Sequence, residues 1–220
     1  MFAFLLDGGF RPAHDRQCRQ PDAGPLSRCS PPFVRPGEAG VIAHFARLAN
    51  GPVPVVVYDV PRRTGQYLTA GALRRLAALP GVVGVKYAPG EINADTLALL
   101  ADPPPDFAIL CGDDPFASAL LALGAHGAVL ATAHVATRAF ARLVSTWRDG
   151  HVAVARPLGG RLSRLSTALF AEPNPTVIKA VLHAHRRIPT ANVRPPLLPA
   201  APVPHLLDEI ADTIGRTIPE

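Results

Sequence analysis

The chain has 220 residues, of which 48% are hydrophobic and 18% are charged. These values exclude an intrinsically disordered chain and allow a sizeable core in one domain or two small ones. The formal net charge of +5 rests on arginines spread along the chain singly and in pairs, without a basic run, so we expect no nucleic-acid partner.

The first thirty residues are the least regular part of the sequence. "RPAHDRQCRQPDAGPLSRCSPP" (11–32) follows neither a helical nor a strand period, so residues 1–30 are predicted to be irregular. "MFAFLLDGGF" (1–10) is too short for a membrane span and lacks the basic start of a signal peptide. The three cysteines are odd in number and show no metal-ligand spacing, so we expect neither a disulfide framework nor a zinc site. Such cysteine usage favours a cytoplasmic location.

From residue 31 onward, apolar runs of strand length alternate with segments of helical period. Such alternation predicts the α/β class, with a parallel sheet covered on both faces over residues 31–150. Residues 151–220 are predicted to be a C-terminal helical region, because only helical period is found there, broken by two proline-rich stretches. The four predicted strands lie at about 53–58, 82–87, 107–111 and 127–132.

Lys86 stands at the end of the apolar run "GVVGV" in a chain that has only two lysines. Functional side chains of parallel α/β proteins gather at the C-terminal ends of strands. Partial burial at such a place favours the neutral amine, which can attack a carbonyl and form a Schiff base. The alternative is a lysine whose ammonium simply reaches solvent from the strand end.

Two further candidates follow the preceding strand. Tyr58 ends that strand and can carry a proton beside an imine, or it is a half-buried aromatic residue of the core. Arg63 follows in "DVPRRTG" and can bind a substrate carboxylate with two hydrogen bonds, or it forms a surface ion pair. Asp113 and Asp114 precede a helix and are interpreted as capping residues, so we expect neither a metal nor a cofactor.

The motifs "YDVPRRTG" (58–65), "VVGVKYAPG" (82–90), "ILCGDD" (109–114), "LGAHGAVLATAHV" (123–135) and "LFAEPNPTVIKAVL" (169–182) occur in this order. Together they resemble the dihydrodipicolinate synthase / N-acetylneuraminate lyase family over about residues 30–199. The resemblance implies a partial (β/α)8 TIM barrel with strands five to eight, a degraded fourth strand at 25–32, and C-terminal helices. It also implies that a full barrel would form a homo-oligomer.

The resemblance also assigns roles to individual residues. Lys86 matches the lysine that forms a Schiff base with pyruvate, and Tyr58 matches a tyrosine that relays protons. Arg63 matches the arginine that binds the carboxylate of aspartate semialdehyde. Val129 falls on the residue that lines the pyruvate pocket. The implied function is a Schiff-base lyase that condenses pyruvate with aspartate semialdehyde in lysine (diaminopimelate) biosynthesis.

Several departures from the family pattern leave other functions open. The family's opening strands and their Gly-Thr-Thr-Gly-Glu loop are not found, through truncation or through a mispredicted gene start. Phe33 replaces a second relay tyrosine, and Tyr87 replaces a glutamate. The alternatives are a related aldolase of 2-keto-3-deoxy sugar acids or N-acetylneuraminate, and an inactive fragment that associates with a full-length homologue. Arg63 favours the condensation with aspartate semialdehyde.

Overall fold

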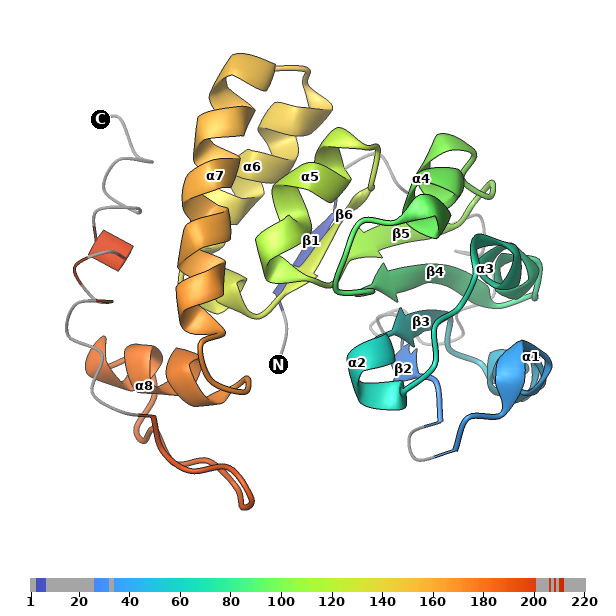
Figure 1. The fold of residues 1–220 in the computed structure, drawn as a ribbon, viewed down its shortest axis with the longest axis horizontal. Helices are drawn as coiled ribbons and strands as arrows, with labels where there is room; N and C mark the ends of the chain where they lie inside the picture. Colours follow the sequence, from blue (N-terminus) through green and yellow to red (C-terminus); the bar gives the residue numbers. More distant parts are fainter. Residues whose placement is uncertain are drawn as a thin grey trace. The chain divides into compact units, whose positions relative to one another are not determined.

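The computed structural model describes residues 3–6, 26–31, 34–200, 206, 208, 210 and 211 (Figure 1). Its strands are β1 (Ala3–Leu6), β2 (Leu26–Cys29), β3 (Val55–Asp59), β4 (Val82–Tyr87), β5 (Ala108–Cys111) and β6 (Gly127–Leu130). Its helices are α1 (Gly37–Ala49), α2 (Pro61–Thr64), α3 (Ala70–Ala77), α4 (Ala94–Ala101), α5 (Ala117–Ala122), α6 (Thr137–Arg148), α7 (Val152–Leu169) and α8 (Thr176–Ala184). Two 3-10 turns, η1 (Asp114–Phe116) and η2 (Thr132–His134), precede α5 and α6.

The strands form one sheet in the order β1-β6-β5-β4-β3-β2. Neighbouring strands from β2 to β6 pair in parallel. Every residue of β4, β5 and β6 is buried. Continuous apolar strands of this kind are typical of a parallel sheet that is covered on both faces, because no side of the strand meets water.

All four strands predicted at 53–58, 82–87, 107–111 and 127–132 are confirmed, as β3 to β6, with small differences at their ends. The degraded fourth strand expected at 25–32 is present as β2. Both β1 and β2 lie inside the segment that the sequence predicts to be irregular. The sequence of β2, "LSRC", lacks the continuous apolar run of β5 and β6, and β2 is fixed by its pairing with β3.

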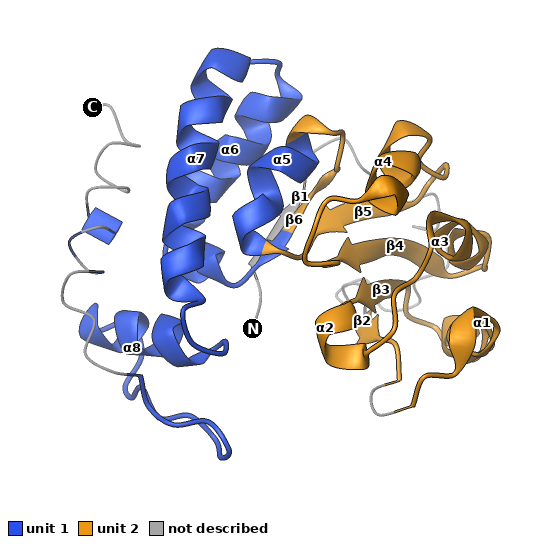
Figure 2. Cartoon of the chain, viewed as in Figure 1, with its two compact units in different colours: residues 1–5, 114–121, 129–220 blue, residues 6–113, 122–128 orange. Residues whose placement is uncertain are grey.

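The chain divides into two compact units (Figure 2). Unit 1 comprises residues 1–5, 114–121 and 129–220, and unit 2 comprises residues 6–113 and 122–128. The division at 30 and 150 that the sequence suggests stays a prediction.

In unit 2, helices α1, α3 and α4 follow one another in a row beside the strands (Figure 1). α1 contacts β3, and α3 contacts β4. The sequence of α3, "AGALRRLA", explains this packing. Leu73 and Leu76 are three residues apart and both are fully buried, whereas Arg74 and Arg75 face outward and make polar contacts. The apolar stripe therefore attaches the helix to the sheet.

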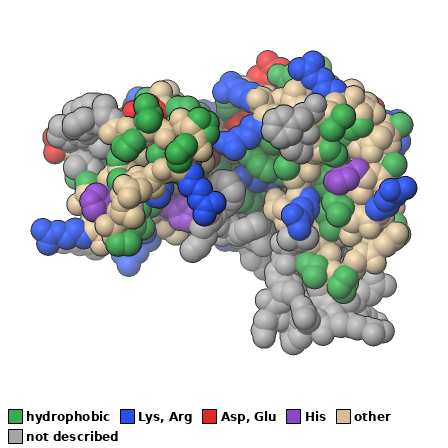
Figure 3. All heavy atoms as spheres, turned by 90° about the horizontal axis from the view of Figure 1, so that it is seen from below, with side chains coloured by type: hydrophobic (Ala, Val, Ile, Leu, Met, Phe, Trp, Pro, Cys, Tyr) green, Lys and Arg blue, Asp and Glu red, His purple; other side chains and the backbone are tan. Residues whose placement is uncertain are grey.

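Unit 1 is dominated by helices, of which α6 and α7 pack against each other and α7 also contacts η1 and η2. Gly159 allows the close approach of α7, since a Cβ atom there would lie 1.9 Å from Ser118 Oγ. The same hydroxyl oxygen accepts a hydrogen bond of 3.0 Å from Trp147 Nε1. None of the described helices is both long and apolar enough to cross a membrane. On the face drawn in Figure 3, arginine and lysine side chains lie in several separate places.

Candidate active site at the ends of β3, β4 and β5

The two candidates Tyr58 and Lys86 are brought together by strand register. They are Cα partners in the parallel pair of β3 and β4, so their side chains leave the same face of the sheet. Lys86 is only 2% exposed, and its Nζ lies 4.1 Å from the centroid of the Tyr58 ring. An ammonium or amine at this distance is in contact with the π face of the ring. The alternative of a lysine that reaches solvent is therefore wrong.

Backbone hydrogen bonds tie the ends of the three strands together. The amide of Ala88 donates to the carbonyl oxygen of Asp59 at 2.9 Å, and the amide of Gly112 donates to that of Tyr87 at 2.7 Å. These bonds continue the ladders one step past Lys86. The lysine is thus held in rigid sheet rather than in the loop that follows.

The segment after β4 is held by contacts from both neighbouring strand ends. Asp113 Oδ2 accepts a hydrogen bond of 2.6 Å from the amide of Gly90, and Arg62 Nη2 donates to the carbonyl oxygen of Gly90 at 3.4 Å. Gly90 has φ of +82°, a left-handed conformation that glycine adopts without strain. Asp114 accepts a hydrogen bond from the amide of Thr132. Both aspartates therefore fix loops, and their interpretation from sequence as helix caps stays a prediction.

Two ionisable side chains lie next to the site but alternate to the opposite face of their strands. Burial raises the pKa of Asp59 to about 7, and the charge of Asp113 adds to the shift. Burial also raises the pKa of Tyr87 to about 12, with smaller contributions from Asp59, Asp95 and Asp113 against a lowering hydrogen bond from Thr96. The Tyr87 hydroxyl lies 3.0 Å from Thr96 Oγ1, so this residue attaches β4 to α4.

The remaining sequence candidates are placed as follows. Arg63 is exposed in the short helix α2, which begins with Pro61 and ends at the left-handed Gly65. Val129 is buried in β6. Phe33, where the family has a relay tyrosine, lies outside the described residues. Among the described residues, no group of three histidine, cysteine or acidic side chains is arranged to hold a metal ion.

Unit 1 has an open hollow of about 420 Å³ beside the end of α8. Its lining comes from one short stretch and includes His183, Arg186 and Arg187. Arg187 Nη1 donates a hydrogen bond to the carbonyl oxygen of His134, and His183 Nδ1 lies 3.3 Å from the carbonyl oxygen of Ile188. Two of the three basic groups therefore hold the turn after α8 in place.

The model of the Dihydrodipicolinate synthetase family matches residues 23–206. The chain belongs to this family. It is 39% identical over 170 residues to the 4-hydroxy-tetrahydrodipicolinate synthase of Leptothrix cholodnii, which covers 77% of this chain and 57% of that protein. The enzyme of the same name from Methanothrix thermoacetophila is 36% identical over 175 residues, covering 79% and 58% of the two chains.

Solved structures of the dihydrodipicolinate synthetase family confirm the fold class, a partial barrel with C-terminal helices. The dihydrodipicolinate synthase of Acinetobacter baumannii, crystallised with pyruvate, is similar with a TM-score of 0.78 and 29% identity, over 89% of this chain and 66% of that one. The Thermotoga maritima enzyme gives a TM-score of 0.80 and 26% identity, over 91% and 68%. The chain spans somewhat under three fifths of the length of the curated relatives it matches.

Sequence reasoning missed the contribution of Gly112 to this site. A Cβ atom on Gly112 would lie 2.9 Å from Lys86 Cγ and 3.1 Å from Lys86 Cε. The signal was present as the glycine of "CGDD", which directly follows β5. Its meaning depends on which side chain of the neighbouring strand lies across it, and that is a tertiary property.

Proposed function

We propose that Lys86 forms an imine with pyruvate, and that the chain carries this step of a synthase that condenses pyruvate with aspartate semialdehyde in lysine biosynthesis. The observation that carries the proposal is the buried Lys86 amine over the ring of Tyr58. Arginine could not replace the lysine, because a guanidinium does not lose its proton in this pH range. The choice of pyruvate and aspartate semialdehyde as substrates is supported by membership of the dihydrodipicolinate synthetase family.

The chemistry follows from a neutral amine in a sheltered position. Lys86 Nζ adds to the keto carbon of pyruvate, and loss of water from the adduct gives the imine. The imine nitrogen withdraws electrons from the neighbouring methyl carbon, which then gives up a proton to form an enamine. The enamine carbon attacks the aldehyde of the second substrate. Tyr58 is the described side chain placed to carry protons in these steps, because its ring adjoins Nζ.

Arg63 is the proposed binding group for the carboxylate of the aldehyde substrate. Arg63 is exposed on α2, four residues after β3 ends at Asp59. Within the part of the chain that the structure describes, Arg62 is the neighbour that makes a backbone contact, to Gly90. Both arginines are exposed, but Arg62 holds the loop at Gly90, which leaves Arg63 as the candidate for a substrate carboxylate.

Borohydride trapping tests the proposal directly. The full chain is incubated with millimolar pyruvate and reduced, and the digested peptides are weighed. We expect the adduct on the peptide that contains Lys86 and none on the peptide that contains Lys179, the only other lysine of the chain. Lys86→Arg should abolish the adduct. An adduct on Lys179 alone, or one that persists in Lys86→Arg, contradicts the proposal.

A substrate panel separates the proposed reaction from the related aldolases. The full chain is loaded with pyruvate without borohydride and is offered aspartate semialdehyde in one arm and aldehyde sugars in the other, and product formation is measured. We expect aspartate semialdehyde to be preferred, and Arg63→Ala to reduce its use roughly ten- to a hundredfold, since charge-assisted contacts are worth about 1.5–3 kcal/mol. Arg62→Ala is the matched control. Equal use of sugar aldehydes would favour the aldolase instead.

A further inference from the structure

The side chain of Lys86 runs across a gap that Gly112 leaves in the sheet. Gly112 follows β5, which pairs with β4 in parallel, with Lys86 opposite Leu110 and Tyr87 opposite Cys111. Gly112 is thus the next residue along on the neighbouring strand. The lysine Cγ and Cε atoms would lie 2.9 and 3.1 Å from a Cβ at this position, closer than carbon atoms normally approach.

The backbone of Gly112 does not itself require glycine. Its φ lies outside the left-handed region in which side chains are strained. Its amide donates to the carbonyl oxygen of Tyr87, a bond that an alanine would also make. The remaining near atom is Ala88 Cβ, 3.0 Å from the same position. What glycine provides here is therefore space, and two of its three nearest side-chain atoms belong to Lys86.

Lys86 is buried, and its amine is in contact on a second side. It is 2% exposed, and its amine already lies against the Tyr58 ring on the neighbouring strand β3. The lysine side chain therefore lies between the Tyr58 ring of β3 and the space that Gly112 leaves just after β5. A methyl group at position 112 must displace the Lys86 side chain at Cγ, close to the backbone. This displacement also moves Nζ at the end of the side chain.

We infer that Gly112 is a positioning residue, whose missing side chain allows Lys86 to hold its amine over Tyr58. The inference rests on the proposed function for its catalytic consequence, but the placement of the lysine can be tested without any reaction. In Gly112→Ala we expect the amine to leave its position. The rate of pyruvate trapping should then fall roughly ten- to a hundredfold, because a displacement of about 1 Å has that effect on a reacting group.

A double-mutant cycle tests the contact itself. Melting temperatures are measured for the full chain, Gly112→Ala, Lys86→Ala and the double variant. We expect Gly112→Ala to lower the melting temperature by about 2–10 °C or to prevent folding, and to have much less effect in the Lys86→Ala background, where Cγ is gone. Equal destabilisation in both backgrounds, including failure to fold in both, would overturn the inference. So would no destabilisation in either.

Nuclear magnetic resonance supplies the positional readout. Lysine labelled with ¹³C at Cε gives two signals, from Lys86 and Lys179, and the Tyr58 ring current shifts the first. We expect Gly112→Ala to move the Lys86 signal and to leave the Lys179 signal in place. The control is Gly71→Ala, where a Cβ meets only Thr69 Oγ1 at 3.7 Å. It should change neither signal.

The two proposals fail in different ways. If the unaltered chain traps no pyruvate but the Lys86 signal moves in Gly112→Ala, the proposed function fails and the positioning role stands. If the chain traps pyruvate and Gly112→Ala traps it at the same rate with an unmoved signal, the positioning role is overturned and the function stands.

Discussion

Asp59 is a carboxyl group in the interior, with 2% of its surface exposed. Burial and the charge of Asp113 raise its pKa to about 7, from about 3.8 in an unfolded chain. Between these two values the folded chain keeps a proton that the unfolded chain has lost. Asp59 therefore contributes stability below pH 4, and this contribution is lost progressively as the pH rises toward 7.

Asp59→Asn should remove this pH dependence. A pKa shift of this size changes the free energy of unfolding by about 4 kcal/mol between acid and neutral pH. We expect the variant to be more stable than the unaltered chain at pH 8, and the difference to shrink toward pH 4.5. Urea unfolding at several pH values measures it. Asp102→Asn, at an exposed position, is the control, and an unchanged pH slope in Asp59→Asn would contradict the assignment.

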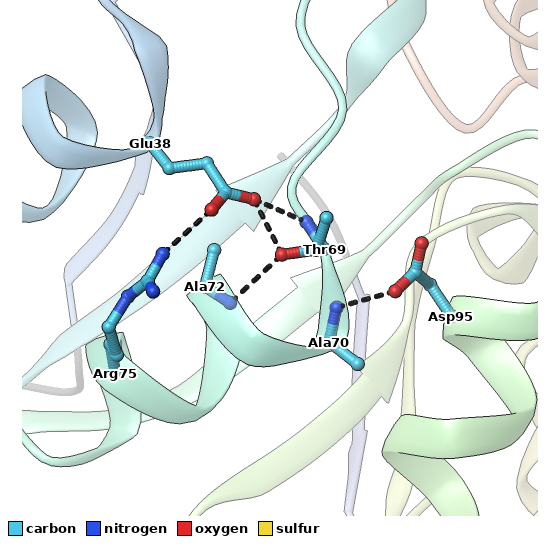
Figure 4. A network of polar contacts seen from close by, with 6 residues as sticks. All are labelled: Glu38, Thr69, Ala70, Ala72, Arg75 and Asp95. Carbon is cyan, nitrogen blue, oxygen red and sulfur yellow. Dashed lines mark hydrogen bonds and ion pairs between the residues drawn. The ribbon is translucent and has the colours of Figure 1, made fainter.

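At the scale of elements, hydrogen bonds at the start of α3 connect it to α1 and to α4 (Figure 4). The Thr69 hydroxyl accepts a hydrogen bond of 3.1 Å from the Ala72 amide and donates one of 2.6 Å to Glu38 of α1. The amide of Ala70 donates to Asp95 of α4 at 2.9 Å. Two carboxylates thus meet the helix N-terminus, where the exposed amides favour negative charge.

The same network lowers the pKa of Glu38. The cause is first the Thr69 hydroxyl, then the Thr69 amide, with smaller help from Arg75, whose Nη2 lies 2.7 Å from the carboxylate. Because the folded pKa is the lower one, this contribution is present near neutral pH and is lost on acidification. Glu38 and Asp59 therefore act in opposite directions, and the stability of unit 2 depends on both.

Thr69→Val should lose the cap and the hydroxyl's hydrogen bond to Glu38 together, while the bond from the backbone amide to Glu38 remains. We expect a decrease of about 1–2 kcal/mol in the free energy of unfolding, since a capping threonine contributes about this much. Urea unfolding followed by circular dichroism measures the change. Thr167→Val is the matched control, because its exposed hydroxyl only donates to the Ser163 carbonyl oxygen within α7. Equal decreases in the free energy of unfolding in both variants would contradict a stabilising role of the Thr69 cap.

At the scale of the whole molecule, β2 is the terminal strand of the sheet and pairs only with β3 among the described residues. A strand edge offers unpaired backbone donors and acceptors to any other chain. In β2, Ser27, Arg28 and Cys29 are exposed. We therefore expect the chain to associate with itself through this edge.

Sedimentation velocity over a range of concentrations tests this expectation. The unaltered chain should form species larger than the monomer, in proportions that rise with concentration. Ser27→Lys should reduce them, because a lysine on an edge strand opposes pairing. Asn50→Lys adds the same charge at the exposed end of α1 and should have little effect. A chain that stays monomeric throughout, or equal effects of the two variants, would contradict the expectation.

Local pattern in the sequence was enough for most elements and for choosing the candidate residues of the proposed site. Apolar runs predict β3 to β6, because strands that are buried on both faces are mostly apolar. The Thr69 cap of α3 was visible for the same local reason. Lys86 and Tyr58 were identified from their places at strand ends, and their contact follows from parallel register.

Other features depend on which residues the fold brings together, and only the tertiary structure decides them. The strand β2 is held by its pairing with β3, since its sequence "LSRC" has no apolar run of its own. The raised pKa of Asp59 needs burial and Asp113 from β5's end, fifty-odd residues later in the chain. The need for glycine at position 112 arises from the Lys86 side chain of the neighbouring strand, which occupies the space that a Cβ would need. Sequence spacing carries no measure of these distances, because packing and register set them.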